Sequence, residues 1–461
     1  MREYSPKRRT AVVFTGSGTT GAYHAGVLKA LDESGFKIDL VVGSGIGAAT
    51  AAFAAVTGGP RLYGPGGFWS GVRWRSFYRL RPVVRLALGL LGVSFAIFAA
   101  PMLLGLALGI VITLLLIVER VLPGSAARTI ARLWVAPETL SGPYLAAQAV
   151  PVFALAMLAI VVVARLWLRD RRRFAEAFES FFDARPGLWR LRQALWQVAG
   201  GAAARTPAPG EAELGRRYAA LLAENLGQPG FRELILRTSD LDRSAPLAFV
   251  LFKDGTPARR AGTLADAVDL RAAGQDALFF DALATSLLCP MAMPLRRVSF
   301  PKGAVHAGET HRLTDATFVA GCGIEEALAA GAEQVIVVTG VPEKSGPLAR
   351  RRGPLARLDA LARALEAQAA REIESLERLG LERRGPAELD LWVIRPERRT
   401  LGPLELDGVR DPATEVAQMV DDLVELGFRD AYRQFVEPVV GQAPLPERVE
   451  GKYRDTQPVG L

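Results

Sequence analysis

The sequence contains little cysteine and little histidine. Its 461 residues include two cysteines, Cys289 and Cys322, and three histidines, His24, His306 and His311. Two cysteines are too few for the disulfide framework of a small secreted protein and fit a reducing compartment. No cysteine and histidine spacing typical of a zinc site occurs, so we expect no metal and no cofactor. For the three histidines we expect ordinary structural or solvated roles.

A secretory signal and a nucleic-acid-binding motif are also lacking. The basic N-terminus leads into a single short apolar segment, which predicts no signal peptide. The net charge is +8, but the arginines cluster beside apolar segments and no aromatic and basic RNA-binding pattern occurs. We therefore attribute the charge to membrane topology and expect no nucleic-acid partner.

Charged residues are absent from two long apolar segments, residues 86–118 and 141–164. Each is longer than the ~20 residues that an α-helix needs to cross a bilayer. Hydrophobic residues make up 50% of the chain, which also favours a membrane segment. We predict a transmembrane helical hairpin whose longer segment must tilt, protrude or break, with Pro101 as the expected breaking point. A re-entrant hairpin with one span is the alternative.

Arginines flank the two apolar segments on their outer sides. These arginines are Arg73, Arg75, Arg79, Arg81 and Arg85 before the first segment, and Arg165, Arg169, Arg171, Arg172 and Arg173 after the second. The residues between the segments carry mixed charge. Because positively charged residues favour the cytoplasmic side, we expect a multi-pass membrane protein that contacts membrane lipid and whose folded domain is cytoplasmic.

Two short apolar strands are each followed by a glycine-rich turn and a helix. The strand at 11–15 precedes the sequence Gly-Ser-Gly-Thr-Thr-Gly at 16–21 and a helix at 22–34. The strand at 39–42 precedes Gly-Ser-Gly-Ile-Gly at 43–47 and an alanine-rich helix. Backbone N–H groups at the start of such a helix suit a phosphate or a developing oxyanion.

The spacing of Gly16, Gly18 and Gly21 leaves more than one interpretation open. It allows a nucleotide-binding membrane protein, and it also allows a tight turn that binds nothing. A dinucleotide fold requires an acidic residue at the end of the second strand, whereas Asp39 lies at the start of that strand. The nucleotide interpretation is therefore disfavoured.

The second turn has the sequence context of a hydrolase nucleophile elbow without its serine. In a G-x-S-x-G elbow, the serine lies midway between the outer glycines, which are here Gly43 and Gly47. The nucleophile position is therefore Gly45. Ser44 lies one residue too early, and we expect its side chain to point away from the site. Since glycine offers no oxygen or sulfur nucleophile, we expect impaired catalysis.

Residues 16–31 followed by 43–47 resemble the start of the patatin-like phospholipases. In that family a G-G-G-x-R-G loop forms the oxyanion hole, G-x-S-x-G carries the nucleophile, and D-G-A or D-G-G supplies the aspartate of a Ser–Asp dyad. The resemblance resumes at residues 234–252, 282–294, 313–338, 389–396 and 412–435. It implies an α/β fold, a three-layer sheet domain that acts on or binds lipid acyl groups.

The chain departs from the family pattern at several site positions. The resemblance places the nucleophile at Gly45, the dyad aspartate at Asp315, the loop's arginine at Thr20 and its middle glycine at Ser17, while Gly16, Gly18 and Gly21 are kept. Together with the two apolar segments, the resemblance therefore implies a catalytically impaired, membrane-anchored patatin-like protein with a possible protein partner. An active lipid acyl hydrolase that uses Ser44 as an unconventional nucleophile is the alternative.

The expected domain organisation is a patatin-like domain interrupted by the membrane hairpin. We expect the following parts: 1–60, the N-terminal part of the patatin-like domain; 61–175, the membrane insertion; 176–230, a helical connector; 231–440, the remainder of the domain; and 441–461, a mobile tail. The insertion follows the elbow helix, so both halves of the domain lie on one side of the membrane.

Overall fold

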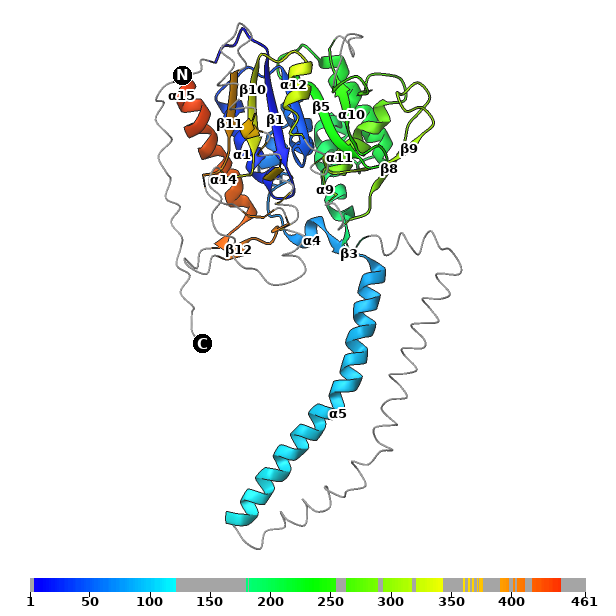
Figure 1. Cartoon of the computed structure of the whole chain (residues 1–461), viewed down its shortest axis with the longest axis vertical. Coiled ribbons are helices and arrows are strands. Elements are labelled where there is room, and N and C mark those ends of the chain that lie inside the picture. The colour runs from blue at the N-terminus through cyan, green and yellow to red at the C-terminus, as the bar shows by residue number, and fades with distance from the viewer. Residues whose placement is uncertain are drawn as a thin grey trace. The chain divides into compact units, whose positions relative to one another are not determined.

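The computed structural model describes residues 4–121, 180, 182–253, 263–288, 293–316, 321–342, single positions between 360 and 375, 390–397, 401–402, 404–410 and 417–440. Its contacts divide the chain into two compact units, Met1–Arg79 with Ala184–Leu461, and Leu80–Asp183. Figure 1 shows the sheet and helices of the first unit and the long helix α5 of the second. The first unit is therefore built from two segments of the sequence that flank the second.

In the described part of the chain, nine strands form the central sheet of the first unit. Strands β11, β10, β1, β2 and β5 run parallel in this order. β6 joins β5 antiparallel, β7 joins β6, and the β8–β9 hairpin joins β5 through β9. The strands are β1 (Thr10–Gly16), β2 (Leu40–Gly45), β5 (Glu233–Asp240), β6 (Ala245–Leu251), β7 (Val268–Asp269), β8 (Arg296–Ser299), β9 (Thr310–Thr314), β10 (Gln334–Thr339) and β11 (Asp390–Ile394).

Helices cover both faces of this sheet (Figure 1). Successive residues of β1 face opposite layers: Val13 lies in a buried cluster with Ile324 of α12, and Phe14 contacts the ring of His24 on α1. The helices of the unit are α1 (Thr20–Glu33), α2 (Gly47–Ala54), α3 (Pro60–Tyr63), α4 (Trp74–Phe77), α9 (Arg185–Ala199), α10 (Glu211–Asn225), α11 (Phe279–Thr285), α12 (Ile324–Ala329), α14 (Val420–Ala431) and α15 (Glu437–Val440). The predicted three-layer α/β fold with parallel strands is confirmed.

The central parallel strands are apolar because both of their faces are covered. Every residue of β1, β2 and β10 is buried. The predicted strand at 39–42 was too short at its C-terminal end. β2 continues to Gly45, since Ser44 and Gly45 pair with Thr15 and Gly16 of β1.

Helices α1 and α14 pack with their backbones in contact. A Cβ atom on Gly26 of α1 would overlap the carbonyl oxygen of Val424, and one on Gly427 of α14 would overlap that of Tyr23. A larger residue at either glycine would push the helices apart. The last long helix in the described part of the chain therefore covers the first.

The described part of the second unit consists largely of α5 (Pro82–Val121), a helix of 40 residues. The expected break at Pro101 was wrong, because α5 continues through this residue. A proline removes one helical hydrogen bond but does not always end the helix. The exposed large apolar side chains of α5 are Leu86, Leu88, Leu91, Val93, Phe95, Ile110, Val111, Leu114, Ile117 and Val118.

Among the described residues, no helix combines the length and the apolar character required to cross a membrane. The predicted transmembrane hairpin is therefore not supported by the structure. Several side chains of α5, the whole of 141–164 and the expected tail at 441–461 lie outside the described residues. The membrane passages and the expected domain boundaries stay predictions.

A buried ion pair joins the sheet to the helix α12. Arg237 of β5 donates from Nε to Glu326 Oε1 at 2.6 Å, and these side chains are only 4% and 3% exposed. Arg237 also donates to the carbonyl oxygen of Gly321. A charge at this depth is tolerated only with its partner, because removal of one member leaves the other charge buried and unpaired.

We expect Arg237→Met to lower the free energy of unfolding by about 3 to 5 kcal/mol. Arg237→Met combined with Glu326→Leu should recover most of this loss, because no unpaired charge then remains. Arg312→Met is the matched control: its pair with Asp242 is far more exposed, at 48% and 32%, and its loss should cost under about 1 kcal/mol. Denaturant unfolding followed by tryptophan fluorescence measures all four proteins. Equal losses for Arg237→Met and Arg312→Met would contradict this account.

Candidate functional site

The glycine-rich loop and the predicted elbow lie at the same edge of the sheet. β1 and β2 are parallel neighbours, and Gly16 at the end of β1 pairs with Gly45 at the end of β2. The loop continues into α1, and the turn continues through Ile46 into α2. Both helices thus begin at the carboxyl edge of the sheet, where α/β folds commonly bind ligands.

Gly45 lies where a nucleophile would be expected, facing the predicted aspartate. Its φ is +62°, in the left-handed region that favours glycine. A Cβ atom on Gly45 would overlap the carbonyl oxygen of Gly16 and would lie 2.9 Å and 3.3 Å from Asp315 Oδ1 and Oδ2. The structure therefore brings together the positions of the Ser–Asp dyad, but the oxygen nucleophile is missing.

Asp315 reaches Gly45 because of the way in which β9 pairs. β6 pairs along one edge of β5, and β2 pairs along the other edge as far as Arg237. β9 pairs with the same edge as β2, but further along, at Ser239 and Asp240. β9 runs antiparallel to β5 and therefore toward the end of β2. Asp315 directly follows Thr314, the last residue of β9, and is 2% exposed.

The backbone N–H of Ile46 is already engaged. In strand–turn–helix elbows, the N–H of the residue after the nucleophile is a typical oxyanion donor. Here Ile46 donates to the carbonyl oxygen of Gly16 at 2.8 Å. The carbonyl oxygen of Gly16 thus accepts the hydrogen bond of Ile46 N–H and also fills the space that a Cβ atom at position 45 would need. Ile46 was missed in the sequence, although its place after Gly45 is a usable signal.

Thr20 fills the place at which the family carries an arginine. It is 7% exposed, and its Cγ2 would lie 2.7 Å from a Cβ on Gly16 and 2.6 Å from one on Gly340, the residue after β10. Gly340 follows a distant strand, so no local sequence pattern indicates it. Thr20 therefore packs against two glycines, at the ends of β1 and β10.

The remaining loop residues form a compact turn. Thr20 N donates to Ser17 O and Gly21 N donates to Gly18 O, both at 3.2 Å. Thr19 Oγ1 donates to the carbonyl oxygen of Gly402 at 2.7 Å, which ties the loop to a distant segment. These N–H groups at the start of α1 are thus engaged within the turn.

Ser44 lies within β2 and is 1% exposed. It shares a face of the strand with Val42, which belongs to the buried cluster beneath α12. Its neighbour across the parallel pair is Arg237, the residue of the buried ion pair. The structure therefore places Ser44 on the α12 side of the sheet, whereas Gly45 and Asp315 meet at the turn.

His24 is buried completely beside the loop. Its Nε2 lies 3.1 Å from the carbonyl oxygen of Thr15, to which it donates, while Nδ1 has no hydrogen-bond partner in the described part of the chain. Burial lowers the pKa of His24 to about 3. The imidazole is therefore neutral at physiological pH and braces the end of β1.

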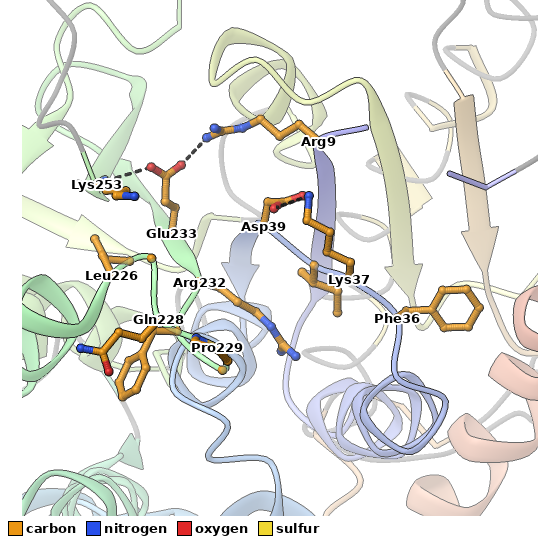
Figure 2. Close-up of a pocket in the computed structure, with 14 residues that line it drawn as sticks. Arg9, Phe36, Lys37, Asp39, Leu226, Gln228, Pro229, Arg232, Glu233 and Lys253 are labelled. Atoms are coloured by element: carbon orange, nitrogen blue, oxygen red, sulfur yellow. Dashed lines mark hydrogen bonds and ion pairs between the residues drawn. The ribbon is translucent and has the colours of Figure 1, made fainter. Parts of the chain in front are cut away.

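A cavity of about 510 Å³ lies at the opposite edge of the sheet (Figure 2). Arg9 and Asp39 line it at the beginnings of β1 and β2, and Arg9 pairs there with Glu233. Because parallel strands separate these residues from Gly45, the cavity is not part of the candidate site. Asp39 accepts from Thr10 N at 3.0 Å and cannot reach a ligand on the glycine loop, which disfavours a dinucleotide site further.

The elbow-like turn, the facing aspartate and the glycine loop thus lie together at one edge of the sheet, with a glycine at the position predicted for the nucleophile. Residues 12–129 match the family model for the patatin-like phospholipases. For this part of the chain, the match confirms the resemblance seen in the sequence. No curated protein matches the chain.

We expect His24 to make stability depend on pH. Its pKa is lowered on folding, so its contribution is fully present above about pH 6.5 and is lost as the pH falls toward 3. At pH 5 the loss should reach roughly 2 kcal/mol. His24→Gln, which keeps a donor for Thr15, should show a correspondingly smaller drop in unfolding free energy between pH 7 and pH 5. An identical drop in both proteins would mean that folded His24 takes up a proton in this range.

Proposed function

We propose that this protein is a membrane-anchored member of the patatin-like phospholipase family that binds lipid acyl groups without hydrolysing them. The observation that carries this proposal is Gly45 itself. It holds the nucleophile position opposite Asp315, and it has no side chain. Acyl transfer of this kind requires an oxygen or sulfur nucleophile, which glycine does not supply.

The loop geometry supports the loss of catalysis independently of Gly45. The Gly16 carbonyl oxygen takes the Ile46 N–H that would stabilise an oxyanion. One missing oxyanion donor lowers the rate by ~10² to 10³. A serine restored at position 45 would therefore still meet an altered loop and should regain little activity.

The alternative enzyme, which would use Ser44, is less consistent with the contacts. Ser44 is buried within β2, beside Arg237 and on the α12 side of the sheet. Asp315 faces Gly45 instead. To act as a nucleophile, Ser44 would need the turn to be rebuilt so that its hydroxyl reached the same side as the carboxylate.

Membrane anchoring is proposed from the apolar surface of α5. Leu91 is 67% exposed and Phe95 is 71% exposed, and uncharged residues continue over 86–118. Soluble proteins rarely leave such a continuous apolar surface in water. We propose that this helix lies in lipid and that the arginines outside both apolar segments hold the patatin-like domain on the cytoplasmic side.

We expect the wild-type protein to show no labelling by a fluorophosphonate probe and no hydrolysis of short-chain esters. Gly45→Ser should lower thermal stability by the equivalent of ~1 to 3 kcal/mol, because a side chain there is strained and meets Gly16. Gly45→Ala is the matched control, with the same Cβ and no hydroxyl: it should lose similar stability and never label. Weak labelling of Gly45→Ser that disappears with Asp315→Asn would indicate a vestigial dyad.

The Ser44→Ala variant separates the two interpretations. It should leave both the stability and the absence of labelling nearly unchanged, because Ser44 takes no part in the proposed site. Wild-type turnover that disappears in Ser44→Ala would contradict the proposal and make Ser44 the nucleophile.

We expect the full chain to stay with membranes after an alkaline carbonate wash. Replacing Leu91, Phe95 and Leu114 by Asp should release it, because a charge in a membrane helix costs up to about 2.5 to 3.5 kcal/mol at the helix centre and less toward its ends. The control is Val305→Asp, which adds a charge at another exposed apolar position, outside α5. Retention of the triple variant, or release of the control, would contradict anchoring by α5.

A further inference from the structure

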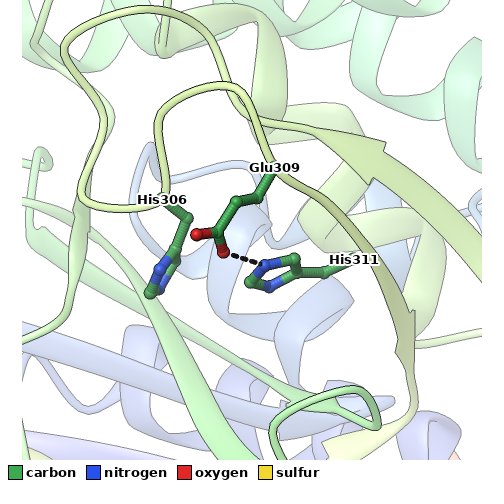
Figure 3. A group of neighbouring side chains, drawn as sticks. All are labelled: His306, Glu309 and His311. Atoms are coloured by element: carbon green, nitrogen blue, oxygen red, sulfur yellow. Dashed lines mark hydrogen bonds and ion pairs between the residues drawn. The ribbon is translucent and has the colours of Figure 1, made fainter.

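Three side chains with metal-binding groups converge at the β8–β9 hairpin (Figure 3). Glu309 N donates to His306 O at 3.0 Å, so a turn folds His306 back toward Glu309. His311 lies two residues beyond Glu309 in an extended segment, so both side chains point to the same face. The turn and the strand together bring His306, Glu309 and His311 to one point.

The three groups are close enough to share an ion. Their ligand atoms all lie within 4.8 Å of one another, and Glu309 Oε2 is 2.7 Å from His311 Nε2. The two histidines are buried at 7% and 5% exposure, whereas the Glu309 side chain is 63% exposed. The site is therefore rigid on its histidine side and open to solvent on its carboxylate side.

Asp240 supplies a second, independent observation. Its Oδ2 lies 2.6 Å from His311 Nδ1 and is almost fully buried. Metal-binding histidines commonly donate their other ring N–H to a carboxylate, which fixes the ring and directs the free nitrogen toward the metal. His311 has this arrangement. Without a metal, its Nε2 donates to Glu309 at 2.7 Å, and zinc binding releases this proton to solvent so that Nε2 can bind the ion.

We propose that His306, Glu309 and His311 form a zinc site with an open fourth position that water fills. Two imidazole nitrogens and one carboxylate are a donor set that zinc uses when it keeps such a position. Ligands at about 2.0 to 2.1 Å from a tetrahedral zinc lie about 3.3 to 3.4 Å apart. Zinc binding therefore requires the ligand atoms to move, and of the three side chains that of Glu309 is the most exposed.

Arg243 is the competitor for this site. Its Nη1 lies 2.9 Å from His306 Nε2 and donates to it, and its Nη2 pairs with Asp266. A neutral imidazole offers one lone pair, so Arg243 and the metal compete for His306. Zinc binding therefore requires Arg243 Nη1 to leave His306, while its partner Asp266 is exposed.

The site has a defined place in the fold. His311 belongs to β9, the strand whose end positions Asp315 beside Gly45. A zinc ion would fix the hairpin loop to β9 and, through Asp240, to the end of β5. The role we assign to the metal is to hold this strand, and it does not depend on whether the patatin-like site binds lipid.

The test is calorimetric titration of the purified full chain, after chelator treatment, with zinc chloride alone. We expect one saturable site per chain and a higher melting temperature with zinc. Glu309→Gln and His311→Ala should each weaken binding more than about 100-fold, and Asp240→Asn about 10- to 100-fold. Glu325→Gln, which removes a carboxylate on α12 away from the hairpin, is the control and should bind as the wild type does.

Arg243→Met makes the test sharper, because it should bind zinc more tightly than the wild type. A structural effect of the other variants on folding would not produce this gain. Circular dichroism of each variant identifies any that fail to fold. Glu309 is exposed, so Glu309→Gln should fold normally while it removes one of the zinc ligands. No saturable binding by either the wild type or Arg243→Met, or wild-type affinity in Glu309→Gln, would overturn the proposal.

Discussion

The parallel pairing of β1 with β2 is the constraint on which the candidate site depends. It places Gly16 opposite Gly45, so the backbone of one turn contacts the backbone of the next. The carbonyl oxygen of Gly16 then accepts a hydrogen bond from Ile46 N–H and lies where a Cβ atom on residue 45 would be. A side chain at position 45 would press against this loop, so the glycine at position 45 and the loop conformation depend on each other.

The core of this fold was predictable because its signals are local. Apolar strands, glycine turns and following helices lie next to one another in the sequence, and their order matches a known family. The position of Gly45 followed from the spacing of two glycines. The end of β2 was misplaced, because the pairing of Ser44 with Thr15 that extends the strand is set by the sheet and not by local sequence.

The parts of the site that were missed depend on contacts between distant segments. Thr20 meets Gly340 only because β10 lies beside β1. His311 meets Asp240 only because β9 pairs with β5. A chain with three histidines gives no spacing motif for such contacts, so a cluster of two of them appears only in three dimensions. No sequence pattern distinguishes Arg237 from the other arginines. Its large expected contribution to the free energy of unfolding comes from its burial in the folded protein.

The close contact of α1 with α14 has a consequence for the order of biosynthesis. α1 is made near the beginning of the chain, but the helix whose backbone it touches at Gly26 and Gly427 is made near the end. β1 likewise waits for β10. Chains begin to fold as they emerge from the ribosome. The apolar residues of α5 therefore emerge from the ribosome before the first unit is complete. The environment that α5 enters is therefore determined before the patatin-like domain has folded.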